Sequence, residues 1–238
     1  MDSKDICSKD EKLSLKQEIV TQELLGAVSD FEVEDSSAHL SGEPQVRSLV
    51  LGNEDKRDAE LCEKILDEDE VWRGKIFSAN RLQVELPDGR RTLRDVVRHG
   101  GAVGIVALTS NNKICLVRQY RTALDRVTVE IPAGKLEPGE DPLDCAHREL
   151  LEETGMRAEK MGYLTTIASS CGFTDELIHI YLATNIHFDS SCPDPDEFIN
   201  VDLVDVSEFV DEVLDGHIED SKTVVGALLW DAISHRLV

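Results

Sequence analysis

Short runs rich in apolar and β-branched residues, broken by turn residues, occupy the middle of the chain. KIFSANRLQVEL (75–86) and RRTLRDVVR (90–98) are separated by the turn sequence PDGR, and they indicate a small β module. AVGIVAL (102–108) and KICLVRQY (113–120) flank the residues SNN. We expect these two runs to pair as a β-hairpin.

The second half of the chain alternates between strand and helix patterns. KMGYLTTIAS (160–169) and ELIHIYLATNI (176–186) predict further strands, and VSEFVDEVLDG (206–216) predicts a helix. A longer helix is expected to begin near DSKTVVGALLWDAIS, with Asp220 or Ser221 as N-cap. The elements interleave without the regular βαβ spacing of a Rossmann sheet and without an internal repeat. The order predicts a mixed α/β sandwich.

The chain divides by composition into three parts. Residues 1–59 are acidic and mixed, and we expect a loosely attached arm that is disordered or partly helical. Its one helical pattern, LSLKQEIVTQELLGAV (13–28), has the alternative reading of a helix that binds a partner or an oligomer mate. The β module is expected over 60–98, and the main domain over 99–238.

Charge narrows the classes of partner. The 238 residues contain 48 acidic and 25 basic side chains, a net charge of −23, which repels nucleic acids and anionic membranes. The first residues carry no apolar signal core, and no later run is long enough to span a bilayer, so we expect a cytoplasmic protein. The six cysteines contain no CxxC pair, which favours reduced, mostly buried thiols.

One predicted helix is dense in carboxylates. Asp141 followed by Pro142 is a strong helix start, and Gly155 is the matching stop. The recurring positions Leu143, Ala146 or His147, and Leu150 are expected to form its buried face. The spacing leaves a second face, which is expected to be exposed and which carries the carboxylates Glu149, Glu152 and Glu153.

Like charges at helical spacing repel one another, so this second face needs an explanation. The simple alternative is a solvated acidic face supported by salt bridges. The glycine-containing loop GKLEPG before the helix is longer than a surface helix requires. Mg²⁺ binds a few carboxylates together with phosphate oxygens and water, so we favour a magnesium site, with Mn²⁺ as an alternative ion.

The same segment resembles a known family. GKLEPGEDPLDCAHRELLEETGM (134–156) matches the complete Nudix hydrolase signature in its fixed residues Gly134, Glu140, Arg148, Glu149, Leu150, Glu152, Glu153, Gly155 and Met156. The resemblance implies an α/β/α sandwich and Mg²⁺-dependent cleavage of a nucleoside diphosphate linked to another group. It implies that Glu149, Glu152 and Glu153 are metal ligands, that Gly134 shapes the loop, and that Glu140 and Arg148 form a structural ion pair.

Flanking stretches resemble the ADP-ribose pyrophosphatase branch of that family. They are HGGAVGIVAL (99–108), VRQYR (117–121), EIPAGKLEPGE (130–140) and GFTDE (172–176). This likeness implies hydrolysis of ADP-ribose to AMP and ribose 5-phosphate. It also implies that the Ala133 carbonyl binds metal and that Arg121 holds the diphosphate; the alternative for Arg121 is a surface arginine at a strand end. PDPDEFINV (193–201) resembles a catalytic loop, which makes Glu197 the candidate general base and Asp196 the substitute.

One departure from the branch leaves the substrate open. Ser170-Cys171-Gly172 stands where these relatives have Ser-Pro-Gly, so another nucleoside diphosphate sugar such as GDP-mannose is an alternative substrate. Gly100 also replaces a proline, a departure of less consequence. A nucleotide sensor without turnover is the alternative from another class. In this branch the base pocket is usually built from the N-terminal β module of a homodimer, which implies roles for Trp72, Phe77 and Arg98.

Overall fold

The computed structural model describes residue 58 and residues 60–189 and 198–235. All of these residues belong to one compact unit, Lys56–Val238. The helix expected over 13–28 lies outside the described residues, as do Cys7 and Cys192.

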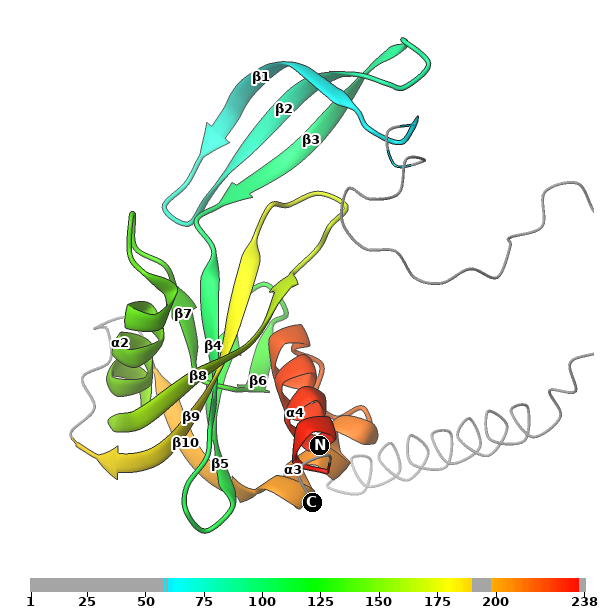
Figure 1. Ribbon diagram of the computed structural model, residues 1–238. Helices are drawn as coiled ribbons and strands as arrows, with labels where there is room; N and C mark the ends of the chain where they lie inside the picture. Colours follow the sequence, from blue (N-terminus) through cyan, green and yellow to red (C-terminus); the bar gives the residue numbers. More distant parts are fainter. Residues whose placement is uncertain (1–57, 59, 190–197, 236–238) are drawn as a thin grey trace, which may run out of the picture. The chain divides into compact units, whose positions relative to one another are not determined.

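An antiparallel sheet forms the first part of the described chain. Its order is β1-β2-β3, with strands β1 (Lys64–Arg73), β2 (Phe77–Glu85) and β3 (Arg91–His99) (Figure 1). The predicted turn joins β2 to β3, and Gly89 adopts a φ of 82° there, a conformation that glycine tolerates best. The sequence analysis missed β1. Its sequence, KILDEDEVWR, is rich in Asp and Glu, which are uncommon in strands.

Two further sheets build the main body. The four-stranded sheet has the order β7-β4-β9-β8, and the three-stranded sheet has the order β10-β5-β6. Their strands are β4 (Ala102–Ala107), β5 (Lys113–Arg121), β6 (Arg126–Glu130), β7 (Ala133–Lys135), β8 (Met156–Ala168), β9 (Leu177–Phe188) and β10 (Ile199–Asp205). β4 pairs in parallel with β9 and antiparallel with β7, so the expected mixed sheet is confirmed.

The expected hairpin of β4 and β5 is wrong. The two strands belong to different sheets, and only a bridge between Leu108 and Ile114 joins them near the turn. β4 instead pairs with β9, far along the chain, and β5 pairs with β10 and β6. Both runs are apolar enough to be buried on two faces, so alternation gave no sign of separate sheets.

Three described helices cover the sheets. They are α2 (Pro142–Thr154), α3 (Val206–Leu214) and α4 (Ser221–Ser234). Figure 1 shows α2 on one side of β4 and β9, and α3 and α4 on the other, which is the expected α/β/α sandwich. The predicted caps are confirmed: the Asp141 side chain accepts from the Leu143 N–H, the Asp220 side chain accepts from the Thr223 N–H, and Gly155 ends α2 at a φ of 69°.

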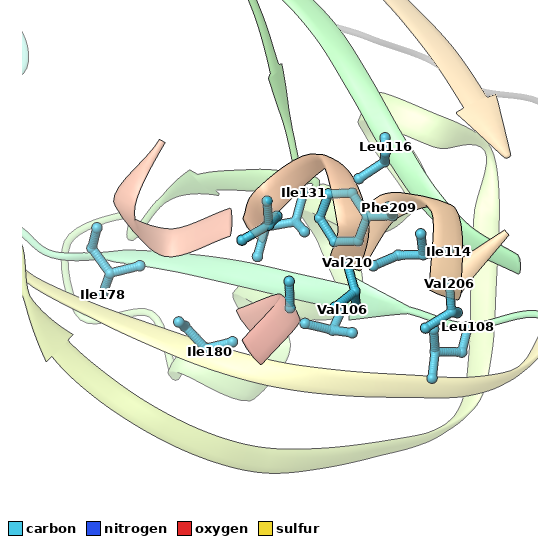
Figure 2. Packing of buried hydrophobic residues seen from close by; sticks show 12 residues of the cluster. Val106, Leu108, Ile114, Leu116, Ile131, Ile178, Ile180, Val206, Phe209 and Val210 are labelled. Carbon is cyan, nitrogen blue, oxygen red and sulfur yellow. The ribbon is translucent and has the colours of Figure 1, made fainter. Parts of the chain in front are cut away.

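The central strand β4 is shared by two hydrophobic cores. Val106 and Leu108 pack in the core beneath α3 and α4, together with Ile131 and Phe209 (Figure 2). The intervening residues, Val103, Ile105 and Ala107, pack in the core beneath α2. The alternation follows from the two-residue period of a strand.

The buried face of α2 differs from the expected one. Leu143 is 38% exposed, whereas Leu150 is fully buried. The buried residues of the helix are Cys145, Ala146, Leu150 and Glu153. Glu153, expected on an exposed face, is therefore buried at the end of the apolar stripe.

The cysteines and the helices bear on two other expectations. Among the described residues Cys115 and Cys145 are buried, and burial raises the pKa of each thiol to about 12. Cys62 and Cys171 are exposed, so the expectation of mostly buried thiols holds for only half of the described cysteines. Within residues 60–189 and 198–235, no helix combines the length and apolar character needed to cross a membrane.

The two leucines of α2 provide a matched test of the packing. Leu150→Ala should lower the free energy of unfolding by about 2–5 kcal/mol, because it leaves a cavity in a filled core. Leu143→Ala should cost less than about 1 kcal/mol, since this side chain is partly solvated. Urea unfolding of both variants measures the difference, and equal costs would contradict the assignment of the buried face.

Candidate active site

A pocket of about 320 Å³ lies where α2, β4, β5, β7 and α4 converge. Most of the residues singled out in the sequence line it, from several separate elements. Its lining is Ile76, Ala102, Val103, Gln119, Arg121, Ala133, Gly134, Lys135, Arg148, Glu149, Glu152, Glu153, Glu176, Ile178 and Lys222. The chain thus brings the carboxylates of α2 and the basic Arg121 to one cavity.

Gly134 allows α2 to approach β7 closely. A Cβ atom built on Gly134 would overlap the carboxyl group of Glu149. Gly134 does not have a positive φ, so its backbone conformation does not call for glycine. The close contact with Glu149 is what requires a residue without a side chain here. The shape of the predicted loop therefore sets the position of a predicted metal ligand.

Arg148 is surrounded by carboxylates. It donates from Nε to Glu140 at 2.8 Å, and from Nη1 to Glu149 at 2.8 Å and Glu152 at 3.0 Å. Hydrogen bonds from Arg148 hold the pKa of Glu140 at about 2, despite the opposing effect of burial. The ion pair that the family resemblance implied is present, and it extends to two of the three glutamates.

Glu153 is held by the strand opposite it. The Ala133 N–H donates to its Oε2 at 3.0 Å, and the residue is only 6% exposed. Glu152 is the most exposed of the three glutamates, with 38% of its side chain accessible. The three carboxylates therefore differ in how exposed they are.

By ligand type, this set of oxygens suits a hard divalent cation. The side-chain oxygens of Glu149, Glu152 and Glu153 line the same pocket as Ala133, and carboxylate and carbonyl oxygens are the ligands that Mg²⁺ prefers. Within the described part of the chain, no group of three or more His, Cys, Asp or Glu side chains is gathered closely enough to hold an ion. The Arg148 guanidinium lies against Glu149 and Glu152 instead.

Arg121 belongs to a second ionic network, on β5, β6 and α4. It donates from Nε and Nη2 to the two oxygens of Glu130, at 2.7 and 2.6 Å. Lys222 donates to Glu130 at 2.5 Å. Burial pushes the pKa of Glu130 upward, but Arg121 and Lys222 outweigh it and hold the pKa at about 2. Arg121, the last residue of β5, is thus a partly exposed arginine that lines the pocket and has a buried partner.

The segment before β9 places another carboxylate in the pocket. Val97 of β3 donates to the Phe173 carbonyl at 2.7 Å, and Asp175 accepts from the His99 N–H at 2.9 Å. This anchoring brings Glu176 to the pocket wall, where its Oε1 lies 3.4 Å from Nδ1 of His99. Glu176 ends the stretch GFTDE, and no role for this residue was predicted from the sequence.

The residues expected to form a base pocket lie beside a different cavity. Arg98 and Phe77 line a pocket of about 240 Å³, and Ile76 borders both this pocket and the larger one. Arg98 donates to Glu68 at 2.9 Å from Nε and to Asp175 at 3.1 Å. Trp72 lines neither pocket; its ring packs against Phe77 with centroids 5.2 Å apart.

Two predicted residues lie outside the described chain, and two residues that line the pocket were not predicted. Glu197 and Asp196 lie outside the described residues, so the assignment of the general base stays a prediction. Lys222 and Gln119 line the pocket and were not found from the sequence. Lys222 is in the first turn of a helix, where a lysine is ordinarily a solvated residue, and its partner Glu130 is 92 residues away.

Comparisons with known proteins find relatives in sequence and in fold. Residues 98–225 match the NUDIX domain family. The chain is 41% identical over 179 residues to a methanol dehydrogenase activator of Bacillus methanolicus, across 73% of this chain and 97% of that protein. It is 40% identical to an ADP-ribose pyrophosphatase of Bacillus subtilis, across 68% of this chain and 89% of the relative. A crystal structure of an ADP compounds hydrolase has the same fold, with a TM-score of 0.66 at 20% identity over 74% of this chain and 95% of that one.

The contact of Gly134 with Glu149 gives a test of the metal site. Gly134→Ala should displace the Glu149 carboxyl group and weaken Mn²⁺ binding on the order of 10- to 100-fold. Electron paramagnetic resonance of free Mn²⁺ measures the affinity. Gly162→Ala is the control, since a Cβ there meets no atom within 4 Å. Equal affinities of the two variants would refute Glu149 as a ligand.

The depressed pKa of Glu130 predicts a pH dependence of stability. Because its folded-state pKa of about 2 lies below the ordinary 4.5, ionised Glu130 stabilises the fold above pH 4.5, and this contribution is lost as the pH falls toward 2. The stability gap between the wild type and Glu130→Gln should therefore narrow by on the order of 3 kcal/mol across that window. Urea unfolding along the pH series measures the gap. Exposed Glu208→Gln serves as the control, and a constant gap for Glu130→Gln would exclude the pairing.

Proposed function

This chain belongs to the Nudix family and is a hydrolase of the Nudix diphosphatase kind, and we propose that it splits ADP-ribose into AMP and ribose 5-phosphate with Mg²⁺. The observation that carries the proposal is the single pocket lined by Glu149, Glu152 and Glu153 on one element and by Arg121 on another. The negative charge of a diphosphate must be offset by cations. This pocket offers ligands for one cation, a metal ion, and itself supplies a second cation, Arg121.

Each side of the pocket has its own part in this proposal. Glu149, Glu152, Glu153 and the Ala133 carbonyl would hold the metal, which when bound neutralises diphosphate charge and lowers the pKa of a water molecule. Arg121 would bind the diphosphate through guanidinium N–H groups that Glu130 leaves available, since a planar guanidinium suits phosphate oxygens.

The reaction needs a group that accepts a proton. Water attacks one phosphorus atom, the bond from that phosphorus to the bridging oxygen breaks, and the water proton passes to a base. We assign the base to Glu197, with Asp196 as the substitute, from the resemblance of 193–201 to the catalytic loop of the branch. A base on a loop that closes over bound substrate would also limit access of bulk water.

The β module supplies the remaining part of the proposal. We assign residues 60–98 to the base pocket and to homodimer formation. Residues 1–59 form an arm that precedes this module in the sequence, and residues 99–238 form the catalytic domain that follows it. Support comes from the exposed Trp72 and Phe77 rings, 52% and 40% accessible, which offer aromatic surface to a base. Arg98 is already engaged by Glu68 and Asp175, which favours a role in shaping the pocket over stacking on the base.

Two alternatives differ from this proposal in testable ways. Another nucleoside diphosphate sugar, such as GDP-mannose, would keep the same chemistry with a different base pocket. A nucleotide sensor would bind without turnover. The complete set of signature residues and the gathered pocket favour an enzyme, since a sensor has no need of the three glutamates.

Substrate profiling with a matched pair of variants tests the proposal. With Mg²⁺, kcat/KM for ADP-ribose should exceed that for GDP-mannose and dinucleotides by at least about tenfold. Glu152→Gln should lower kcat on the order of 100-fold or more, because it removes a metal ligand from an exposed position. Glu208→Gln on α3 should leave kcat unchanged.

The outcomes separate the parts of the proposal. A preference for another sugar would replace the substrate and keep the chemistry. Near-normal kcat in Glu152→Gln would remove the metal role of that residue. Binding of ADP-ribose without turnover of any compound would establish the sensor in place of the enzyme.

A further inference from the structure

Lys222 is a buried cation to which the proposed reaction gives no role. It lies in the first turn of α4, and its side chain is only 10% exposed. It lines the candidate active site and also a second cavity of about 410 Å³ that contains Arg121, Glu130 and Asp220. A buried lysine is costly unless it is paired, so its position requires a reason.

Its partner Glu130 is the centre of a dense hydrogen-bond network. The Glu130 side chain is 3% exposed, and its two oxygens accept four bonds. Oε1 accepts from Arg121 Nε at 2.7 Å and from Thr128 Oγ1 at 2.6 Å. Oε2 accepts from Arg121 Nη2 at 2.6 Å and from Lys222 Nζ at 2.5 Å. These contacts fix the plane of the carboxylate.

The plane of Glu130 in turn fixes the plane of Arg121. A bidentate pair leaves a guanidinium little rotational freedom, because both groups are planar. Arg121 is 41% exposed at its side chain and lines the candidate active site, while Glu130 accepts from two of its three guanidinium nitrogens. Among the described residues, Nη1 of Arg121 has no protein partner, and it remains available to an anion.

The first turn of α4 also contacts the segment between β6 and β7, just before Ala133 and Gly134. Thr223, next to Lys222, accepts from the Ile131 N–H at 2.9 Å through Oγ1, and it donates to Asp220 at 2.5 Å. Lys222 itself contacts Asp220 at 3.0 Å. This turn therefore holds residues 130 and 131 in place, immediately before β7 begins at Ala133.

We propose that Lys222 is a positioning residue for diphosphate hydrolysis: by pairing with Glu130 it holds the Arg121 guanidinium with its Nη1 edge toward the substrate diphosphate. The proposal rests on the function given above. Its physical content is that a second cation on Glu130 keeps the carboxylate ionised and in one orientation.

The first measurement needs no substrate. Nitrogen-15 relaxation of the Arg121 Nε–H group in the ligand-free protein reports its order. In Lys222→Met the order parameter should fall from the rigid range, above roughly 0.8, toward roughly 0.6. Lys113→Met is the matched control, since Lys113 is on the same strand β5 and pairs with Asp205 at 3.2 Å away from the pocket. An unchanged order parameter in Lys222→Met would overturn the proposal.

The second measurement is a double-mutant cycle in KM and kcat. Lys222→Met should raise KM for ADP-ribose on the order of tenfold with a smaller change in kcat, and Arg121→Met should raise it further. In the double variant, Lys222→Met should add less than about twofold to the effect of Arg121→Met, because the lysine acts through the arginine. Effects on KM that multiply would overturn the proposal.

A second variant covers loss of folding. If Lys222→Met melts at a markedly lower temperature, Thr128→Val removes another bond to Glu130 at nearly constant shape. Thr128→Val should lower the Arg121 order parameter and raise KM. In combination with Arg121→Met it should add little further increase in KM, and effects on KM that multiply would refute the positioning role. A wild type that hydrolyses no diphosphate would disprove the proposed function alone, because the relaxation measurement still decides whether Lys222 orders Arg121.

Discussion

The arrangement of the active site depends on the ion pairs of Arg148. This guanidinium touches Glu140 in the loop before α2 and Glu149 and Glu152 on the helix itself, so loop and helix are joined by charge-assisted hydrogen bonds. Three glutamates on one helix would otherwise repel each other. Because an internal cation offsets that repulsion, α2 can pack against β7 and β4 before any metal binds. Gly134 then allows the close approach that sets the position of Glu149.

The rest of the pocket follows from a separation of charge between elements. Carboxylates are gathered on α2, and the basic Arg121 and Lys222 come from β5 and α4, with β4 and β7 between them. Each side has its own counter-ion, the partly exposed Arg148 for the acids and the buried Glu130 for the bases. Pairing of this kind offsets the cost of placing charges in a partly dry cavity.

The sequence predicts features that depend on neighbouring residues, and it fails to predict features that depend on distant ones. The limits of α2 were predicted because Asp141, Pro142 and Gly155 act on neighbouring backbone groups. Its buried face was predicted less well, since periodicity shows a stripe but cannot show that the packing reaches Glu153 and stops short of Leu143. The hairpin of β4 and β5 failed because pairing with β9 and β10 is decided by distant residues. Lys222 was missed for the same reason: its identity as a site residue depends on Glu130, which only the fold brings near.

The two-sided burial of β4 has a consequence for how such an enzyme diversifies. Successive residues of this strand face different cores, Val103 and Ile105 toward α2 and Val106 toward α4. Substitutions beneath α4 can therefore accumulate and be compensated without reshaping the layer beneath α2. The layer that carries Lys222 can then change in sequence while α2 keeps its packing and its three glutamates.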